Sequence, residues 1–256
     1  MGALVAGITD ISAKNRSSEL DSNRLSYTSQ EIARLSTSAE KPSQSLIDQL
    51  YRCKPIVWFH IAAIVMFYLS YLPFSMIAST YFEEKWYKGM KMTQVEKAKE
   101  IGTLLSIPLM ISAVLFPVFG YAVDKIGRRL EFLLLSSVLL ITSYCLFLTT
   151  TSGMPLIILG LSYAIFGAIC WSALALLVPH KIIGTILGLV TILQNFTLTI
   201  FPMFLAYLTT KNNSSLESIL SLLVNSVATL VLVCFVWFFD RKNKGIYLSV
   251  SGSWPN

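Results

Sequence analysis

Six uninterrupted apolar runs constrain this sequence more than any other feature. Each run is long enough for the roughly 20 helical residues that cross about 30 Å of hydrocarbon. The runs are continuously apolar and lack the alternation typical of a membrane barrel, so the sequence predicts an all-α membrane protein with six transmembrane helices. Hydrophobic residues make up 54% of the chain and charged residues 13%, more apolar than a soluble core of this size requires. The expected spans are approximately residues 56–82, 101–123, 130–150, 156–178, 182–208 and 218–239.

The segments outside the runs have a different composition. Residues 12–49 are rich in Ser, Thr, Asn and charge and show no sustained hydrophobic period, which predicts a mostly disordered linker. The opening "MGALVAGITD" resembles an apolar helix leaving the bilayer. We therefore expect a loop over residues 1–55, preceded by a remnant of a truncated helix, then a six-helix unit over residues 56–240 and a tail over residues 241–256.

The distribution of Lys and Arg predicts the orientation in the membrane. Fourteen of the twenty basic residues fall on the side that holds both termini, and an excess of basic residues marks the cytosolic side. Asn212 and Asn213 each begin an N-glycosylation triplet on the other side, where lumenal enzymes would modify them. The net charge of +6 is better explained by cytosolic flanks that meet anionic lipid than by nucleic-acid binding.

Signatures of enzymes and cofactor sites are missing from the sequence. It contains no nucleophile elbow and no phosphate-binding loop, and its four cysteines and two histidines lack metal-ligand spacing. We therefore expect a protein that is not an enzyme and that binds no cofactor or metal.

The turn between the second and third runs carries a patterned group of glycines and charges, "GYAVDKIGRR". Gly127 would permit a tight reversal, and Gly120 would let a neighbouring helix approach. Asp124 could meet an arginine or the positive end of a helix. The six positions of the pattern are Gly120, Asp124, Lys125, Gly127, Arg128 and Arg129.

This pattern resembles the signature loop of the major facilitator superfamily. The resemblance implies a cytosolic latch that holds a transporter in one conformation; the alternative is an ordinary basic turn on the inner side. The stretches at residues 159–195 and "FYLSYLPF" in the first run likewise resemble helices of dipeptide carriers in this superfamily. The resemblance covers roughly residues 56–247, the carboxyl-terminal half of such a carrier.

The resemblance carries further expectations. Two sets of three spans would form an inverted repeat, and the partner would be a missing amino-terminal half. The solute would be a dipeptide or a related small organic molecule. A lysosomal or other endomembrane location is implied, with the plasma membrane as the alternative, together with an accessory glycoprotein as a further partner.

The fifth run carries a small, polar stripe at helical spacing. Gly184 and Gly188 form a pair suited to close helix packing. Thr191, Gln194 and Asn195 follow near the middle of the run, where polar groups need water, substrate or protein partners. They are candidates for the substrate pathway; the alternative is a hydrogen bond between helices that only holds the bundle together.

Aromatic residues in the first and fourth runs are further candidates for the substrate pathway. Tyr68 and Tyr71 lie just before Pro73, which is expected to bend the helix, and Trp171 could stack on a substrate. The alternative for all three is ordinary packing. His60 is expected near the cytosolic interface, where its amphipathic ring would sit comfortably.

The middle of each run lacks Asp, Glu, Lys and Arg. Proton-coupled carriers usually retain a buried carboxylate or a histidine relay for that function, so uniport by alternating access is the predicted mechanism unless coupling groups lie in the missing half. The alternatives are a non-transporting accessory or structural six-helix subunit and a truncated gene product.

Overall fold

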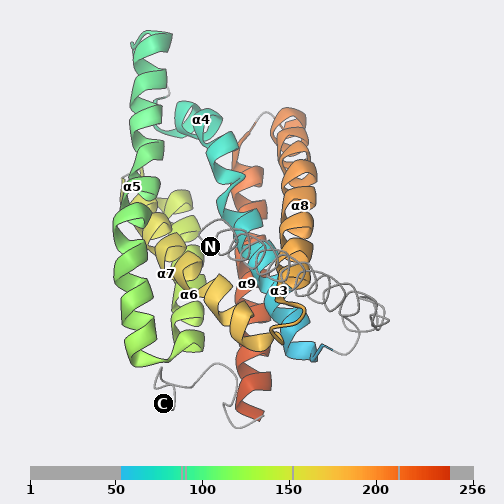
Figure 1. Cartoon of the computed structure of the whole chain (residues 1–256). Helices are drawn as coiled ribbons and strands as arrows, with labels where there is room; N and C mark the ends of the chain where they lie inside the picture. Colours follow the sequence, from blue (N-terminus) through green and yellow to red (C-terminus); the bar gives the residue numbers. More distant parts are fainter. Residues whose placement is uncertain (1–52, 88, 90, 152, 213, 243–256) are drawn as a thin grey trace, which may run out of the picture. The chain divides into compact units, whose positions relative to one another are not determined.

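The computed structural model describes residues 53–87, 89, 91–151, 153–212 and 214–242. Almost all of the loop predicted over residues 1–55 and of the tail predicted over residues 241–256 lies outside these residues. The helices of the described part, shown in Figure 1, are α3 (Pro55–Tyr71), α4 (Phe74–Lys85), α5 (Gln94–Ile126), α6 (Arg129–Thr149), α7 (Met154–Leu177), α8 (Ile183–Asn212) and α9 (Leu216–Lys242).

The described residues contain six candidate membrane spans, as the apolar runs predict. The short helices α3 and α4 together make the first span, and α5 to α9 each make one. The prediction of an all-α membrane protein with six spans is thus confirmed.

The second span begins earlier than its apolar run. Thr93 and Glu96 form a reciprocal capping box: the Glu96 amide donates to Thr93 Oγ1 at 3.3 Å, and the Thr93 amide donates to the Glu96 carboxylate at 2.9 Å. These bonds satisfy two amides that have no partner inside the helix, so α5 starts at Gln94 rather than near Ile101. The apolar run marks only the part of the helix that is suited to lipid.

The first three spans pack against the last three. Helices α5 and α6 pack on α7, while α8 and α9 pack on α3, and α6 also packs on α9. Each set of three therefore packs its second and third spans against the first span of the other set. This reciprocal pairing is the arrangement that an inverted three-plus-three repeat produces.

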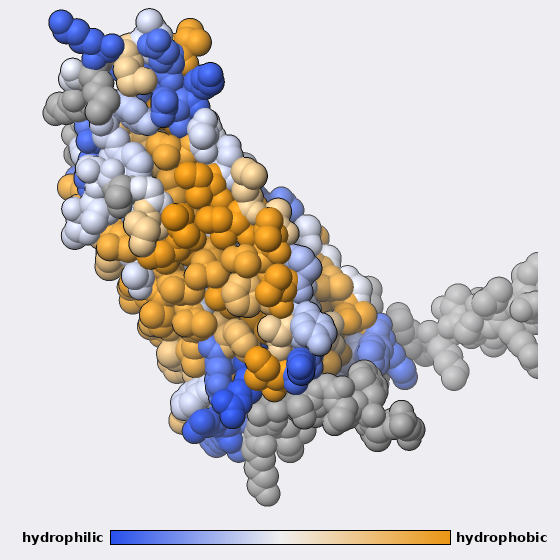
Figure 2. All heavy atoms as spheres, turned by 90° about the vertical axis from the view of Figure 1, so that its left-hand side faces the viewer, coloured by the Kyte–Doolittle hydropathy of each residue, from blue (hydrophilic) through white to orange (hydrophobic). Residues whose placement is uncertain are grey.

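The helices α5 and α8 lie at opposite edges of this unit (Figure 1). Their most apolar stretches are only 17% and 11% buried, against 67% for the first span and 56% for α7. The face on the α5 side carries a broad hydrophobic band between hydrophilic ends (Figure 2). Both edges of the unit therefore present apolar surface to lipid or to another polypeptide.

Candidate functional site

An aromatic cluster lies where the first span meets α7. The indole Nε1 of Trp171 donates a hydrogen bond to the Tyr68 hydroxyl at 3.2 Å. Tyr71 stacks on Tyr163 of α7, with ring centroids 4.0 Å apart and planes 6° apart. The structure thus brings together three residues that the sequence suggests, Tyr68, Tyr71 and Trp171, and adds Tyr163. We call these four residues the aromatic cluster.

The sequence offers little to separate Tyr163 from other aromatic residues in apolar runs. Its position becomes informative only through the neighbours that the fold supplies. Tyr68 meets its ring edge-on at 6.1 Å between centroids, and Phe116 of α5 meets it edge-on at 5.5 Å. Tyr163 is half-buried, so part of the residue remains accessible.

The first span breaks beside this cluster, as Pro73 predicts. The helix α3 ends at Tyr71 and α4 begins at Phe74, because proline has no amide hydrogen to continue the helical ladder. Side chains of other helices bind backbone carbonyls just before the break. Tyr144 donates to the Ser70 carbonyl, and Asn225 donates to the Met66 carbonyl at 2.9 Å.

Neither Tyr144 nor Asn225 is among the residues that the sequence analysis selects. Asn225 also donates to the Ser70 hydroxyl at 2.8 Å, and its side chain lies largely buried. The sequence does contain a signal for it, because an asparagine inside a long apolar run needs a polar partner within the bundle. Together the two side chains hold the bend from the side of α6 and α9.

His60 is buried between α3 and α7, and its expected depth near the cytosolic interface stays a prediction. Its side chain is 1% exposed, and Nε2 lies 3.0 Å from the Cys170 carbonyl of α7. A carbonyl oxygen can only accept, so this ring nitrogen donates. His60 therefore links α3 to α7.

The polar stripe of α8 does not join the aromatic cluster. Thr191 donates to the Leu187 carbonyl at 2.9 Å, and Asn195 donates to the Thr191 carbonyl at 2.8 Å. Both side chains are exposed, and Gln194 is half-buried. Their bonds stay within one helix, so among the described residues Thr191 and Asn195 lie on an open face of α8 rather than against a neighbouring helix.

The glycines expected to allow close packing lie in open space, whereas two others are crowded. A Cβ atom built on Gly184, Gly188 or Gly120 would meet no described atom within 4 Å. A Cβ on Gly160 would lie 2.7 Å from the Pro108 Cα atom. Gly167 is pressed in the same way against the ring of Phe116.

The crowded pair lies on one face of α7, because residues seven apart in a helix point in nearly the same direction. That spacing is a signal that the sequence does contain, although the sequence analysis selects the pair on α8 instead. Close packing at Gly120, Gly184 and Gly188 stays a prediction that would require a surface beyond the described residues.

The charged turn between α5 and α6 has a defined geometry. Gly127 ends α5 with a φ of 74°, and its amide donates to the Val123 carbonyl at 2.8 Å. This left-handed conformation favours glycine. Across the turn, Arg129 pairs with Asp124 at 3.2 Å; the arginine side chain is 13% exposed and the aspartate side chain 71% exposed. An ion pair between a mostly buried arginine and an exposed aspartate thus joins the end of α5 to the start of α6.

The other charges of this turn face outward. Arg128 pairs with Glu131 at 3.4 Å, and both side chains are more than half exposed. Lys125 is exposed as well. These residues are placed to meet solvent or lipid headgroups, and such exposed pairs contribute little stability.

Two further candidates fall at the limits of the described chain. Asn213 lies outside the described residues, and Asn212 is the last residue of α8, with its side chain outside the description. Within the described ranges, His, Cys, Asp and Glu form no group of three that could hold a metal ion.

Comparison with known proteins identifies relatives of this chain. The model of the Major Facilitator Superfamily matches residues 61–249. The lysosomal dipeptide transporter MFSD1 of Gallus gallus is 26% identical over 192 residues, which cover 74% of this chain and 41% of that protein. MFSD1 of Danio rerio is 23% identical over 197 residues, covering 76% and 41%, and MFSD1 of Homo sapiens is 27% identical over 146 residues, covering 56% and 30%. The matched part spans about two fifths or less of the length of these curated relatives.

Proposed function

Because this chain belongs to the Major Facilitator Superfamily, a family of membrane transporters, we propose that it forms one six-helix half of an alternating-access carrier for dipeptides or related small organic solutes. The observation that carries the proposal is the aromatic cluster on the two most buried spans. The second half of the carrier would pack against the exposed edges α5 and α8 and enclose a solute path over the cluster. The choice of a dipeptide as the solute rests on the names of the relatives, which also support a location in the lysosomal membrane.

The chemistry of the cluster suits a small peptide. Tyrosine hydroxyls can donate to or accept from peptide amides, while aromatic faces pack against apolar side chains and attract ammonium groups. The polar groups of the aromatic cluster are tyrosine hydroxyls and an indole, so the cluster itself offers no carboxylate for proton coupling. Uniport is therefore the proposed mode of transport.

Trp171→Ala is expected to lower saturable dipeptide uptake by about tenfold, because it removes both an aromatic face and the donor that orients the Tyr68 hydroxyl. Uptake of labelled dipeptide into liposomes by a carrier that contains this half measures the effect. Trp58→Phe is the matched control, since Trp58 is 40% exposed on α3 and lies outside the aromatic cluster. Unchanged uptake by Trp171→Ala would contradict a substrate role for the cluster, and binding without uptake would favour a non-transporting subunit.

The turn at Gly127 is the proposed cytosolic latch. The basic residues of this turn support a position on the cytosolic side of the membrane. Ser214 and the glycosylation candidates would then lie on the lumenal side. An impermeant thiol reagent added outside cells that carry the protein at their surface should label Ser214→Cys and spare Ile126→Cys. The reverse labelling would overturn the orientation.

Asp124→Asn is expected to slow conformational cycling about threefold to tenfold, with less effect on solute affinity. The substitution removes the charge that pairs with the mostly shielded Arg129, and a partly shielded pair contributes on the order of 1 kcal/mol. Maximal uptake rate and half-saturation concentration, measured separately, distinguish the two effects. Glu131→Gln serves as the control because its pair with Arg128 is exposed on both sides. A loss of affinity equal to the loss of rate would count against a latch.

A further inference from the structure

The end of α4 binds the end of α6, at the side of the unit opposite the turn at Gly127. Lys85 Nζ donates to the carbonyls of Phe147 and Leu148, the latter at 2.9 Å, and Tyr81 donates to the Phe147 carbonyl. These carbonyls belong to the last turn of α6, where helical partners are missing. A cation is also favoured there by the negative end of the helix dipole.

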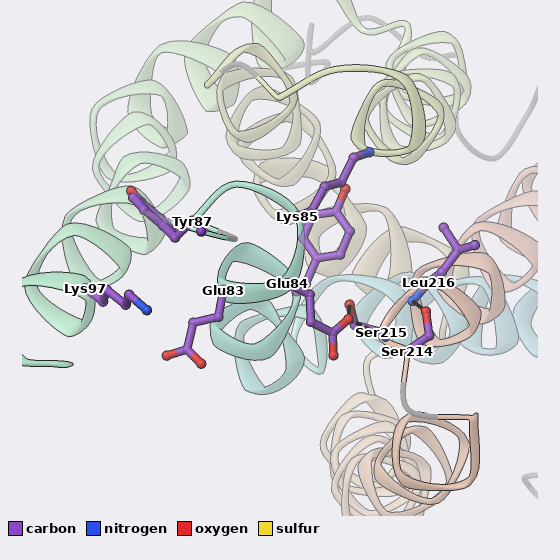
Figure 3. A pocket seen from close by; sticks show the side chains of 10 residues that line it. Glu83, Glu84, Lys85, Tyr87, Lys97, Ser214, Ser215 and Leu216 are labelled. Carbon is purple, nitrogen blue, oxygen red and sulfur yellow. Dashed lines mark hydrogen bonds between the residues drawn. The ribbon is translucent and has the colours of Figure 1, made fainter. Parts of the chain in front are cut away.

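The neighbouring residue Glu84 binds a helix end of the opposite polarity. Its carboxylate accepts hydrogen bonds from the Ser215 amide at 2.8 Å and from the Ser215 hydroxyl at 2.6 Å. Ser215 directly precedes α9, so the carboxylate lies at the positive end of that helix. Figure 3 shows Glu84 turned toward Ser215. We call Tyr81, Glu84 and Lys85, together with these partners, the clasp.

The clasp borders open space. A pocket of about 580 Å³ lies beside it and is also lined by Glu83, Tyr87 and Lys97 (Figure 3). The polar contacts of the clasp add to aromatic packing, because Phe74 and Phe82 of α4 lie against Phe147 of α6.

The part of the first span on the other side of the bend contacts α7 in addition to α6 and α9. In α3, His60 binds the Cys170 carbonyl and Tyr68 binds Trp171. Phe67 also stacks on Phe166 of α7, with centroids 3.7 Å apart. Tyr144 of α6 and Asn225 of α9 also bind α3, and Phe59 of α3 stacks on Phe235 of α9. Both arms of the first span, α3 before the break at Pro73 and α4 after it, are therefore attached to α6 and α9, and α3 is attached to α7 as well.

We propose that Glu84 and Lys85 are positioning residues that fix the end of α4 to the ends of α6 and α9, so that this end of the first span moves together with those two helices when the unit changes conformation. The proposal rests on the carrier function proposed above, because it describes how this half moves.

Hydrogen exchange of the purified 256-residue chain in lipid nanodiscs tests the clasp. In a Glu84→Gln, Lys85→Met double variant, we expect the amides of α4 to exchange about tenfold faster, since charge-assisted bonds that close a local opening are removed. Amides of α3 and α7 should keep their rates. Lys85→Arg should preserve slow exchange in α4, because it keeps the cation that binds the carbonyls.

Glu83→Gln is the matched control, because Glu83 neighbours the clasp and is exposed without contributing to the contacts described. Unchanged exchange in α4 of the double variant would overturn the proposal. An equal rise in all six spans would also overturn it, because the residues would then stabilise the whole fold rather than position one arm. The measurement needs no transport, so its result is independent of whether the chain carries dipeptides.

Discussion

Gly160→Val should destabilise the six-helix unit severely. A Cβ atom at this position would lie 2.7 Å from the Pro108 Cα atom, 2.8 Å from the Pro108 carbonyl oxygen and 3.2 Å from the Ile111 Cβ atom. The first two are backbone atoms and cannot rotate away, so α5 and α7 would have to separate. Overpacking of a tight interface costs about 1–3 kcal/mol, sometimes more, and valine adds two methyl groups beyond the Cβ atom.

Thermal unfolding of the purified chain in detergent, followed by tryptophan fluorescence, measures this loss. Gly160→Ala should lower the unfolding temperature by a smaller amount in the same direction. Gly102→Ala is the matched control on α5, because a Cβ atom there meets no described atom within 4 Å. If Gly160→Val unfolded at the same temperature as Gly102→Ala, the close approach of α5 and α7 would be wrong.

The contrast between these glycines shows what sequence patterns can predict of this fold. Long apolar runs suffice to predict the six spans, because crossing hydrocarbon fixes both their length and their composition. Close packing requires a neighbour, and a run does not specify which helix it will meet. The spacing of Gly184 and Gly188 is as favourable as that of Gly160 and Gly167, yet only the latter pair meets α5 in this structure.

The candidate site was predictable to a similar extent. Tyr68 and Tyr71 stand out because they lie just before Pro73, and Trp171 stands out as an aromatic residue inside an apolar run; the three do come together. Tyr163 joins them through the packing of α3 on α7, which neither run encodes by itself.

The contacts at the bend and at the clasp were not predictable in this way. Tyr144, Lys85 and, in part, Asn225 bind backbone carbonyls of distant helices. A carbonyl acceptor is present at every residue, so the partner leaves no mark in the sequence. Such contacts emerge only once the helices have been placed side by side.

The 256-residue chain by itself is expected to show no saturable dipeptide uptake in liposomes. A path across the membrane needs walls on all sides, and this unit leaves its edges α5 and α8 open, with their most apolar stretches 17% and 11% buried. Thr191 and Asn195 are exposed there, and among the described residues their side chains bond to carbonyls of α8 itself. Polar side chains at this depth are costly against lipid, so a second polypeptide surface is expected to cover them.

Joining the chain to the amino-terminal half of MFSD1 from Gallus gallus tests this expectation. The fusion should raise uptake at least about tenfold above that of the chain alone, because the solute path of a facilitator lies between two halves that move against each other. A Gly188→Ala variant, made in both the chain and the fusion, gives a second test. A Cβ atom there meets nothing within 4 Å in the described unit, so the variant should leave the stability of the chain unchanged and weaken uptake by the fusion. Saturable uptake by the 256-residue chain alone would show instead that two copies can enclose the path. Equal uptake by the fusion and by its Gly188→Ala variant would show that this face of α8 contacts lipid.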